Sequence, residues 1–187
     1  MPSWARVATR SRVPLGFLFA AAYLWWARPT WTSLLVGMVV VAVGIVLRAL
    51  ASGHIRKNAQ LATTGPYAYT RNPLYLGSVL IAVGFIVAAR NLWIGIGAVA
   101  MFAFIYVPVI KAEEAYLRSA FPDYAAYASH VPRLLPRLTP YRAEAAAEAA
   151  FRSFSAELYL RHREYNAALG SVLMIGALIL KMVLVLH

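Results

Sequence analysis

The stretch that decides the fold is Gly65-Pro-Tyr-Ala-Tyr-Thr-Arg-Asn-Pro-Leu-Tyr-Leu-Gly77, together with the uncharged apolar run that completes residues 73–89. Gly65-Pro66 is typical of a turn. Asn72-Pro73 is typical of a helix N-cap followed by proline at the first helical position. The stretch therefore predicts a polar turn that leads directly into an apolar helix, which begins at a membrane surface.

The composition of the whole chain also indicates a membrane protein. Of its 187 residues, 61% are hydrophobic and 13% are charged, whereas about a quarter of a soluble domain is charged. A spanning helix needs roughly 20 apolar residues. The apolar runs predict spans at Val13–Ala27, Pro29–Leu47, Pro73–Ala89, Asn91–Ile110 and Tyr165–His187. The predicted fold class is all-α, a multi-pass transmembrane helical bundle of about five spans.

The basic residues predict which loops lie inside the cell. The richer set of loops holds Arg6, Arg10, Arg12, Arg48, Arg56, Lys57, Arg71, Lys111, Arg118, Arg133, Arg137, Arg142, Arg152, Arg161 and Arg163. The opposite loops hold only Arg28 and Arg90. We therefore expect a protein of the cell inner membrane with a cytoplasmic N-terminus. This distribution explains the net charge of +11, so we expect no nucleic-acid partner.

Cysteine chemistry is excluded, because the chain contains no cysteine. The four histidines are scattered without metal-ligand spacing, so we predict no metal site.

The start of the helix at Pro73 is a candidate anion site. Its first N–H groups and its dipole favour negative charge, and Arg71 beside it can grip a carboxylate through two hydrogen bonds. The alternatives are that Asn72 is only a cap, that Arg71 only touches lipid phosphate, and that the nearby tyrosines form an interfacial belt. Gly77 and Gly84 are typical of close helix packing.

The first acidic residues of the chain, Glu113 and Glu114, directly follow the fourth predicted span. We expect this helix to continue past the bilayer surface, where an anionic leaflet disfavours carboxylates and a cationic partner is expected. The alternative is local pairing with Lys111 or Arg118. Prolines keep Val131–Pro136 extended, so this segment is able to fold back as a lid over the helix ends.

Together the two segments resemble the superfamily of isoprenylcysteine carboxyl methyltransferases and phospholipid methyltransferases. The first family element is Gly-x-Tyr-x-x-x-Arg-His-Pro-x-Tyr-x-Gly, with Asn72 here in place of the histidine. The second combines a glutamate pair, a phenylalanine, Tyr-x-x-Tyr and Val-Pro-x-x-x-Pro. It stands here as Glu113, Glu114, Phe121, Tyr124, Tyr127, Val131, Pro132 and Pro136. The resemblance covers Leu61–Pro136.

The resemblance implies a methyltransferase that uses S-adenosylmethionine and acts on a lipid-like or amphiphilic substrate, by carboxyl O-methylation or amine N-methylation. It implies cytoplasmic interfacial helices that form a cofactor pocket lined by Tyr67, Arg71, Asn72, Pro73, Tyr75, Gly77, Glu113, Glu114, Leu117 and Tyr127. The candidate catalytic residues are Arg71, Glu114 and Tyr75. A glutamate would bind the cofactor ammonium, and Arg71 or Asn72 its carboxylate, unless Arg71 orients an acidic substrate.

We expect a single integral membrane domain over residues 1–187. Its parts are spans one and two (1–52), a methyltransferase-like core (53–136), and an interfacial amphipathic helix at Ala143–Glu164 followed by span five (137–187). Possible ion pairs on that helix are Glu148 with Arg152 and Glu157 with Arg161.

Two other functions compete with the methyltransferase. Membrane sterol reductases share a related fold and an Arg-x-Pro-x-Tyr element but use NADPH. A non-catalytic scaffold would keep the fold without turnover, as the loss of the histidine at Asn72 suggests. The expected partners are the bilayer and the amphiphilic substrate, while the sequence leaves the oligomeric state open.

Overall fold

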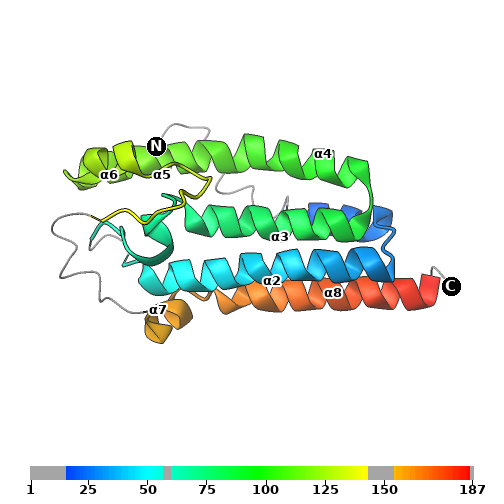
Figure 1. The fold of residues 1–187 in the computed structure, drawn as a ribbon. Helices are drawn as coiled ribbons and strands as arrows, with labels where there is room; N and C mark the ends of the chain where they lie inside the picture. Colours follow the sequence, from blue (N-terminus) through cyan, green and yellow to red (C-terminus); the bar gives the residue numbers. More distant parts are fainter. Residues whose placement is uncertain (1–15, 57–59, 143–153, 186–187) are drawn as a thin grey trace. The chain divides into compact units, whose positions relative to one another are not determined.

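The computed structural model describes residues 16–56, 60–142 and 154–185, in which every regular element is a helix (Figure 1). The elements are Gly16–Trp26, α2 (Trp31–His54), the 3₁₀ helix η1 (Gly65–Ala68), α3 (Pro73–Ala89), α4 (Leu92–Met101), the π-helical η2 (Phe102–Tyr106), α5 (Val107–Ala120), α6 (Tyr124–His130), α7 (Ala156–Arg161) and α8 (Tyr165–Val185). The all-α prediction is confirmed for these residues.

Three helices are long and apolar enough to cross a membrane: α2, the composite helix Leu92–Ala120, and Tyr165–Leu184 of α8. Gly16–Trp26 and α3 are apolar but shorter. At about 1.5 Å per residue, α3 is about 25 Å long, somewhat less than the roughly 30 Å hydrocarbon core. The chain is therefore a multi-pass membrane protein with three candidate spans, and a total of five stays a prediction.

The helix α3 occupies the predicted residues. Its first hydrogen bond runs from Leu76 N to the carbonyl of Asn72, 2.9 Å away, which makes Asn72 the capping position. The helix α2 extends beyond the predicted end at Leu47, to His54. Arg48, assigned from the sequence to a loop, is therefore helical, because a charge ends an apolar run but arginine itself favours helix; its guanidinium pairs with Glu164.

The fourth predicted span continues as one helix from α4 through η2 into α5 (Figure 1). Asn91 caps its start, accepting hydrogen bonds from Trp93 N at 2.9 Å and Ile94 N at 3.4 Å. Glu113 and Glu114 are helical residues of α5, as expected for a helix that runs on past the apolar zone.

The chain divides into two units. Unit 1 holds the described residues of 1–41, 81–116 and 170–187, and unit 2 those of 42–80 and 117–169. The core of unit 1 consists of the buried residues Tyr23, Ala27, Leu34, Ala88, Ala89, Ile94, Leu178 and Met182. The hydroxyl of Tyr23 donates to the carbonyl of Phe85 at 2.8 Å, so a polar bond fixes one helix against another in this apolar core.

Glycines allow helices to approach closely in each unit. In unit 1, a Cβ atom on Gly37 would lie 2.5 Å from the carbonyl oxygen of Gly84. In unit 2, a Cβ atom on Gly77 would lie 2.8 Å from the carbonyl oxygen of Gly44. The expectation that Gly77 and Gly84 serve close helix packing is therefore confirmed.

The described part of the C-terminal region begins at residue 154. Ser155 caps α7, its hydroxyl accepting from Leu158 N at 3.3 Å. The helix ends at Arg161 rather than at Glu164, and Arg163, with φ of 54°, lies in the turn before α8. The possible pair Glu148–Arg152 lies outside the described residues.

Candidate functional site

The site candidate is the N-terminal end of α3 in unit 2, and Gly65 begins the turn that leads to it. Gly65 has φ of 59°, and a Cβ atom there would lie 2.5 Å from Cδ2 of His54. Glycine adopts the left-handed backbone without strain and leaves room for the His54 ring. The 3₁₀ helix Gly65–Ala68 follows at once and turns the chain toward Arg71.

A segment without helix or strand, residues 131–137, runs along this turn and is called the strap. Its carbonyls at Pro132 and Arg133 accept from Arg71 N and from Asn72 Nδ2, both at 2.9 Å. The hydroxyl of Thr70 donates to the carbonyl of Leu134 at 3.0 Å. The strap is therefore fixed against the residues that precede α3, as the lid interpretation of Val131–Pro136 requires.

Tyrosines from α6 pack beneath the same turn. The hydroxyl of Tyr127 donates to the carbonyl of Tyr67 at 2.7 Å, and Nη1 of Arg71 donates to the hydroxyl of Tyr124 at 3.4 Å. The guanidinium of Arg118 lies 5.8 Å from the centre of the Tyr124 ring, within cation–π range. Tyr124 thus contacts two guanidinium groups.

Burial raises the pKa of Tyr127 above its ordinary value; Tyr124 and Tyr141 raise it further, and Arg71 opposes the shift. The phenol of Tyr127 is 2% exposed. It is therefore protonated at neutral pH and acts as a hydrogen-bond donor, which suits a structural role beneath the turn rather than proton transfer.

Most of the predicted site residues lie in unit 2. These are Tyr67, Arg71, Asn72, Pro73, Tyr75, Gly77, Leu117 and Tyr127. Leu117 packs against the buried cluster of Tyr124, Tyr127 and Val131. Glu113 and Glu114 belong to unit 1, so their convergence with Arg71 stays a prediction.

Sequence reasoning missed two residues of this end. Thr70 and Tyr124 are each 1% exposed and each contacts the Arg71 turn or the strap. Tyr124 had a signal, because it begins the Tyr-x-x-Tyr element. Thr70 had none, because its partners are backbone carbonyls that any residue provides.

The electrostatics of the unit 2 site favour an anion. A half-buried guanidinium at Arg71 stands beside the N-terminal end of α3, where the helix dipole is positive. Among the described residues, no group of three or more histidine, cysteine, aspartate or glutamate side chains could hold a metal ion.

Curated relatives match this chain over most of its length. It is 35% identical over 150 residues to the cobalt-zinc-cadmium resistance protein CzcN of Cupriavidus metallidurans, covering 76% of this chain and 69% of that protein. It is 34% identical over 134 residues to the nickel-cobalt-cadmium resistance protein NccN of Alcaligenes xylosoxydans xylosoxydans, covering 69% of this chain and 63% of that protein. The match thus spans less than two thirds of the second relative's length. No solved structure matches significantly.

The sequence model of the phospholipid methyltransferase family matches residues 31–124. This range contains α2, the Arg71 turn, α3 and the glutamate pair of α5. It covers half of the chain and ends at Tyr124, within the second sequence element, and the predicted membership of the superfamily is confirmed. The chain belongs to the phospholipid methyltransferase family.

Proposed function

We propose that the chain is a methyltransferase that uses S-adenosylmethionine and modifies a lipid-like or amphiphilic substrate held in the membrane. The observation that carries the proposal is the family match, because residues 31–124 include both the Arg71 turn and the glutamate pair. Family membership makes this cofactor the expected one, and the residues of the turn supply suitable chemistry for it.

The donor set at the start of α3 fits the carboxylate of S-adenosylmethionine. Arg71 offers a planar pair of N–H donors, and the first turn of α3 adds its positive dipole. On the proposed assignment, Glu113 or Glu114 binds the ammonium group. When bound, the cofactor supplies a methyl group activated by a sulfonium.

The protein's own task is alignment and exclusion of water. The strap, fixed at Thr70, Arg71 and Asn72, covers the residues before α3 and is suited to limiting water access. A carboxylate substrate needs no base. An amine substrate must lose a proton, for which Glu114 or Tyr75 is the proposed acceptor. Asn72 cannot take a proton, and its amide is engaged by the strap.

We further propose five spans, with the N-terminus and the site in the cytoplasm. The helices Gly16–Trp26 and α3 would then cross as short spans, with local thinning of the bilayer. Because the chain has no cysteine, single cysteines at Ser3, Arg90 and Thr139 give a clean test by labelling with a membrane-impermeant thiol reagent. Labelling of Arg90→Cys from outside intact cells, with the other two protected, is expected. Any other pattern overturns this orientation.

Binding and transfer measurements on the purified full-length protein test the enzyme assignment. We expect S-adenosylmethionine to bind, and radiolabelled methyl groups to appear in a bacterial lipid extract. Arg71→Ala and Glu114→Gln should each weaken binding at least about tenfold, the size of a lost charged hydrogen bond. Arg142→Ala, which removes an exposed arginine, should bind normally.

The same measurements separate the competing functions. Binding of NADPH without binding of S-adenosylmethionine would indicate a reductase. Binding of S-adenosylmethionine with no label in any lipid or small molecule would indicate a scaffold. Unchanged affinity in Glu114→Gln would remove Glu114 from the site.

The names of the relatives suggest a cellular context. CzcN and NccN are both named for resistance to cobalt and cadmium. We extend this to the present chain and propose that its methyl transfer supports growth in these metals. In a host strain lacking its own copy, the wild-type gene should restore tolerance to cobalt and cadmium and Arg71→Ala should not. Equal tolerance with both would separate resistance from methyl transfer.

A further inference from the structure

The segment Phe154–Glu164, called the clamp, is docked on the C-terminal end of α2 in unit 2. Ser155 N donates to the carbonyl of Gly53 at 3.1 Å. The ring of Phe154 lies so close that a Cβ atom on Gly53 would be 2.3 Å from it. At the far end of the clamp, Nδ1 of His162 lies 3.2 Å from the carbonyl of Ser52. Because a carbonyl only accepts, this ring nitrogen is the donor.

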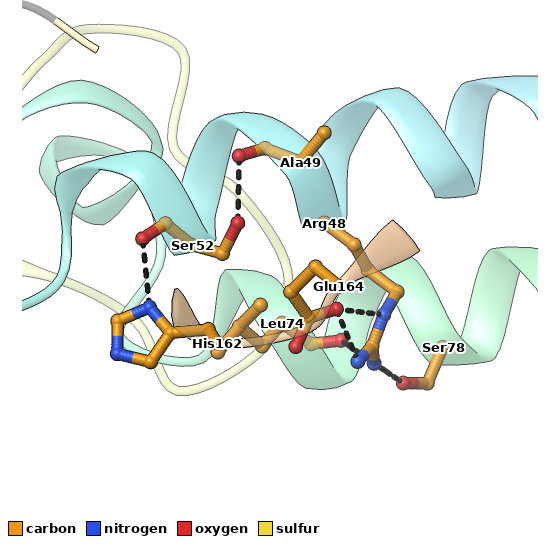
Figure 2. A network of polar contacts seen from close by, with 7 residues as sticks. All are labelled: Arg48, Ala49, Ser52, Leu74, Ser78, His162 and Glu164. Carbon is orange, nitrogen blue, oxygen red and sulfur yellow. Dashed lines mark hydrogen bonds and ion pairs between the residues drawn. The ribbon is translucent and has the colours of Figure 1, made fainter. Parts of the chain in front are cut away.

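Arg48 joins the clamp to α3 (Figure 2). Its Nε and Nη2 atoms donate to Oε2 of Glu164 at 3.0 and 2.7 Å. Its Nη1 atom donates to the carbonyl of Leu74 at 3.2 Å and also to the hydroxyl of Ser78. Figure 2 shows the guanidinium between Glu164 on one side and Ser78 on the other. One side chain of α2 thus binds two further segments.

Gly77 opens the path for this side chain. A Cβ atom at Gly77 would lie 2.6 Å from Cγ of Arg48, so the arginine stem crosses α3 where α3 has no side chain. The glycine of the family element therefore does more than bring two helices together. It lets a guanidinium reach the first turns of α3, at the carbonyl of Leu74 and the hydroxyl of Ser78.

The carboxylate of Glu164 holds the guanidinium in this place. The two side chains are only 22% and 13% exposed, so the ion pair is poorly screened by water. Without the carboxylate, a partly buried guanidinium would lose its counter-charge and be drawn toward solvent. The bonds to Leu74 and Ser78 would then be lost with it.

We propose that Arg48 and Glu164 are positioning residues. With the clamp docked, their ion pair fixes the first turns of α3 and therefore the positions of Arg71 and Tyr75. The proposal rests on the proposed function in taking this end of α3 as the cofactor site. It assigns a role to Glu164, which lies outside the family match at residues 31–124.

Hydrogen–deuterium exchange of the full-length protein tests the positioning directly. In Glu164→Gln we expect amides of residues 154–164 and of the start of α3, including Leu76, to exchange about tenfold faster, since a charged hydrogen bond is lost. Ser78→Ala keeps the ion pair and should affect only α3, by about threefold. Glu157→Gln, an exposed acid of α7, should match the wild type at the start of α3.

Cofactor affinity provides the second readout. The dissociation constant for S-adenosylmethionine should rise about fivefold in Glu164→Gln, a fraction of the effect of a direct charged contact. In Glu164→Asp, which keeps the charge, it should return most of the way to the wild-type value. Unchanged exchange at α3 in Glu164→Gln overturns the proposal. Faster exchange throughout unit 1 as well would identify a general loss of fold and also overturn it.

The two proposals fail in different ways. If the wild-type protein binds no S-adenosylmethionine, the proposed function is wrong and exchange alone decides the positioning role. Faster exchange at both the clamp and α3 then supports it, and faster exchange at the clamp alone overturns it. If the wild type binds S-adenosylmethionine and Glu164→Gln changes neither the affinity nor the exchange at α3, the positioning role is wrong and the proposed function stands.

Discussion

In each unit of the chain a basic side chain binds one part of the C-terminal region, but its partners differ. In unit 1, Nζ of Lys181 on α8 donates to the carbonyls of Leu24, Trp25 and Ala27 at 2.6, 3.0 and 2.7 Å. In unit 2, Arg48 binds the carboxylate of Glu164. Unit 1 therefore uses backbone acceptors at the end of the helix Gly16–Trp26, where carbonyls lack intrahelical partners and the dipole is negative.

The comparison shows how the two attachments depend on sequence. Backbone carbonyls exist in any sequence, so the attachment in unit 1 depends on Lys181 alone. The attachment in unit 2 requires both Arg48 and Glu164, but Ser155 and His162 also bind the clamp to α2 without that pair. Loss of Glu164 therefore leaves other contacts in place, and loss of Lys181 should do more harm.

The largest expected effect is that of Lys181→Met. The substitution keeps the apolar stem but leaves three carbonyls without their donor, and should lower the free energy of unfolding by about 3 kcal/mol, as for a lost charged hydrogen-bond group. Reversible unfolding in detergent micelles measures this. Lys111→Met, at an exposed lysine of α5, is the matched control. Equal stability of the two variants would mean that the carbonyls of Leu24, Trp25 and Ala27 need no lysine.

The next largest effect is expected where glycines bring two helices of unit 1 into contact. A Cβ atom on Gly84 would lie 2.6 Å from the carbonyl oxygen of Gly37, so Gly84→Ala must move backbone and should destabilise unit 1 by about 2 kcal/mol. Gly176→Ala on α8 meets nothing within 4 Å and should be neutral or slightly stabilising. A neutral Gly84→Ala would show that this helix contact is loose.

A smaller effect is expected where unit 2 also relies on backbone acceptors. Thr70→Val keeps the side-chain shape but removes the hydroxyl that donates to the carbonyl of Leu134, so it should lower stability by about 1 kcal/mol. Amides of the strap should exchange faster in this variant. Thr32→Val, at an exposed position of α2, is the control. Unchanged exchange of the strap would mean that its other hydrogen bonds, from Arg71, Asn72 and Arg137, hold it without Thr70.

Sequence patterns predicted the helix bounds that depend on residues close together in the chain. The start of α3 followed from Asn72-Pro73, and its length from an uncharged run that ends at Ala89. The end of α2 did not follow, because Arg48 was taken to mark a loop. A charge ends an apolar run without ending a helix; the partner of Arg48, Glu164, lies 116 positions away along the chain, and no periodicity reveals such a pair.

The candidate site shows the same division. Arg71 and Asn72 were found because they stand in an ordered element with fixed spacing. Their attachment to the strap at Pro132 and Arg133 uses carbonyls, which carry no sequence signal. The prolines predicted that Val131–Pro136 is extended and able to fold back as a lid, while the contacts of Thr70 required the structure.

The smallest expected effect is that of Ser155→Ala in the clamp, which tests whether the short helix α7 depends on its N-cap. Ser155→Ala removes the acceptor for Leu158 N, and a lost N-cap costs about 0.5 kcal/mol or slightly more. The backbone bond from residue 155 to Gly53 survives the substitution, so the clamp should stay docked, and Ser155→Asp should restore the cap. Exchange of residues 156–161 measures the local change. A loss as large as that of Lys181→Met would mean that α7 folds only when capped, and that unit 2 is as dependent on one side chain as unit 1.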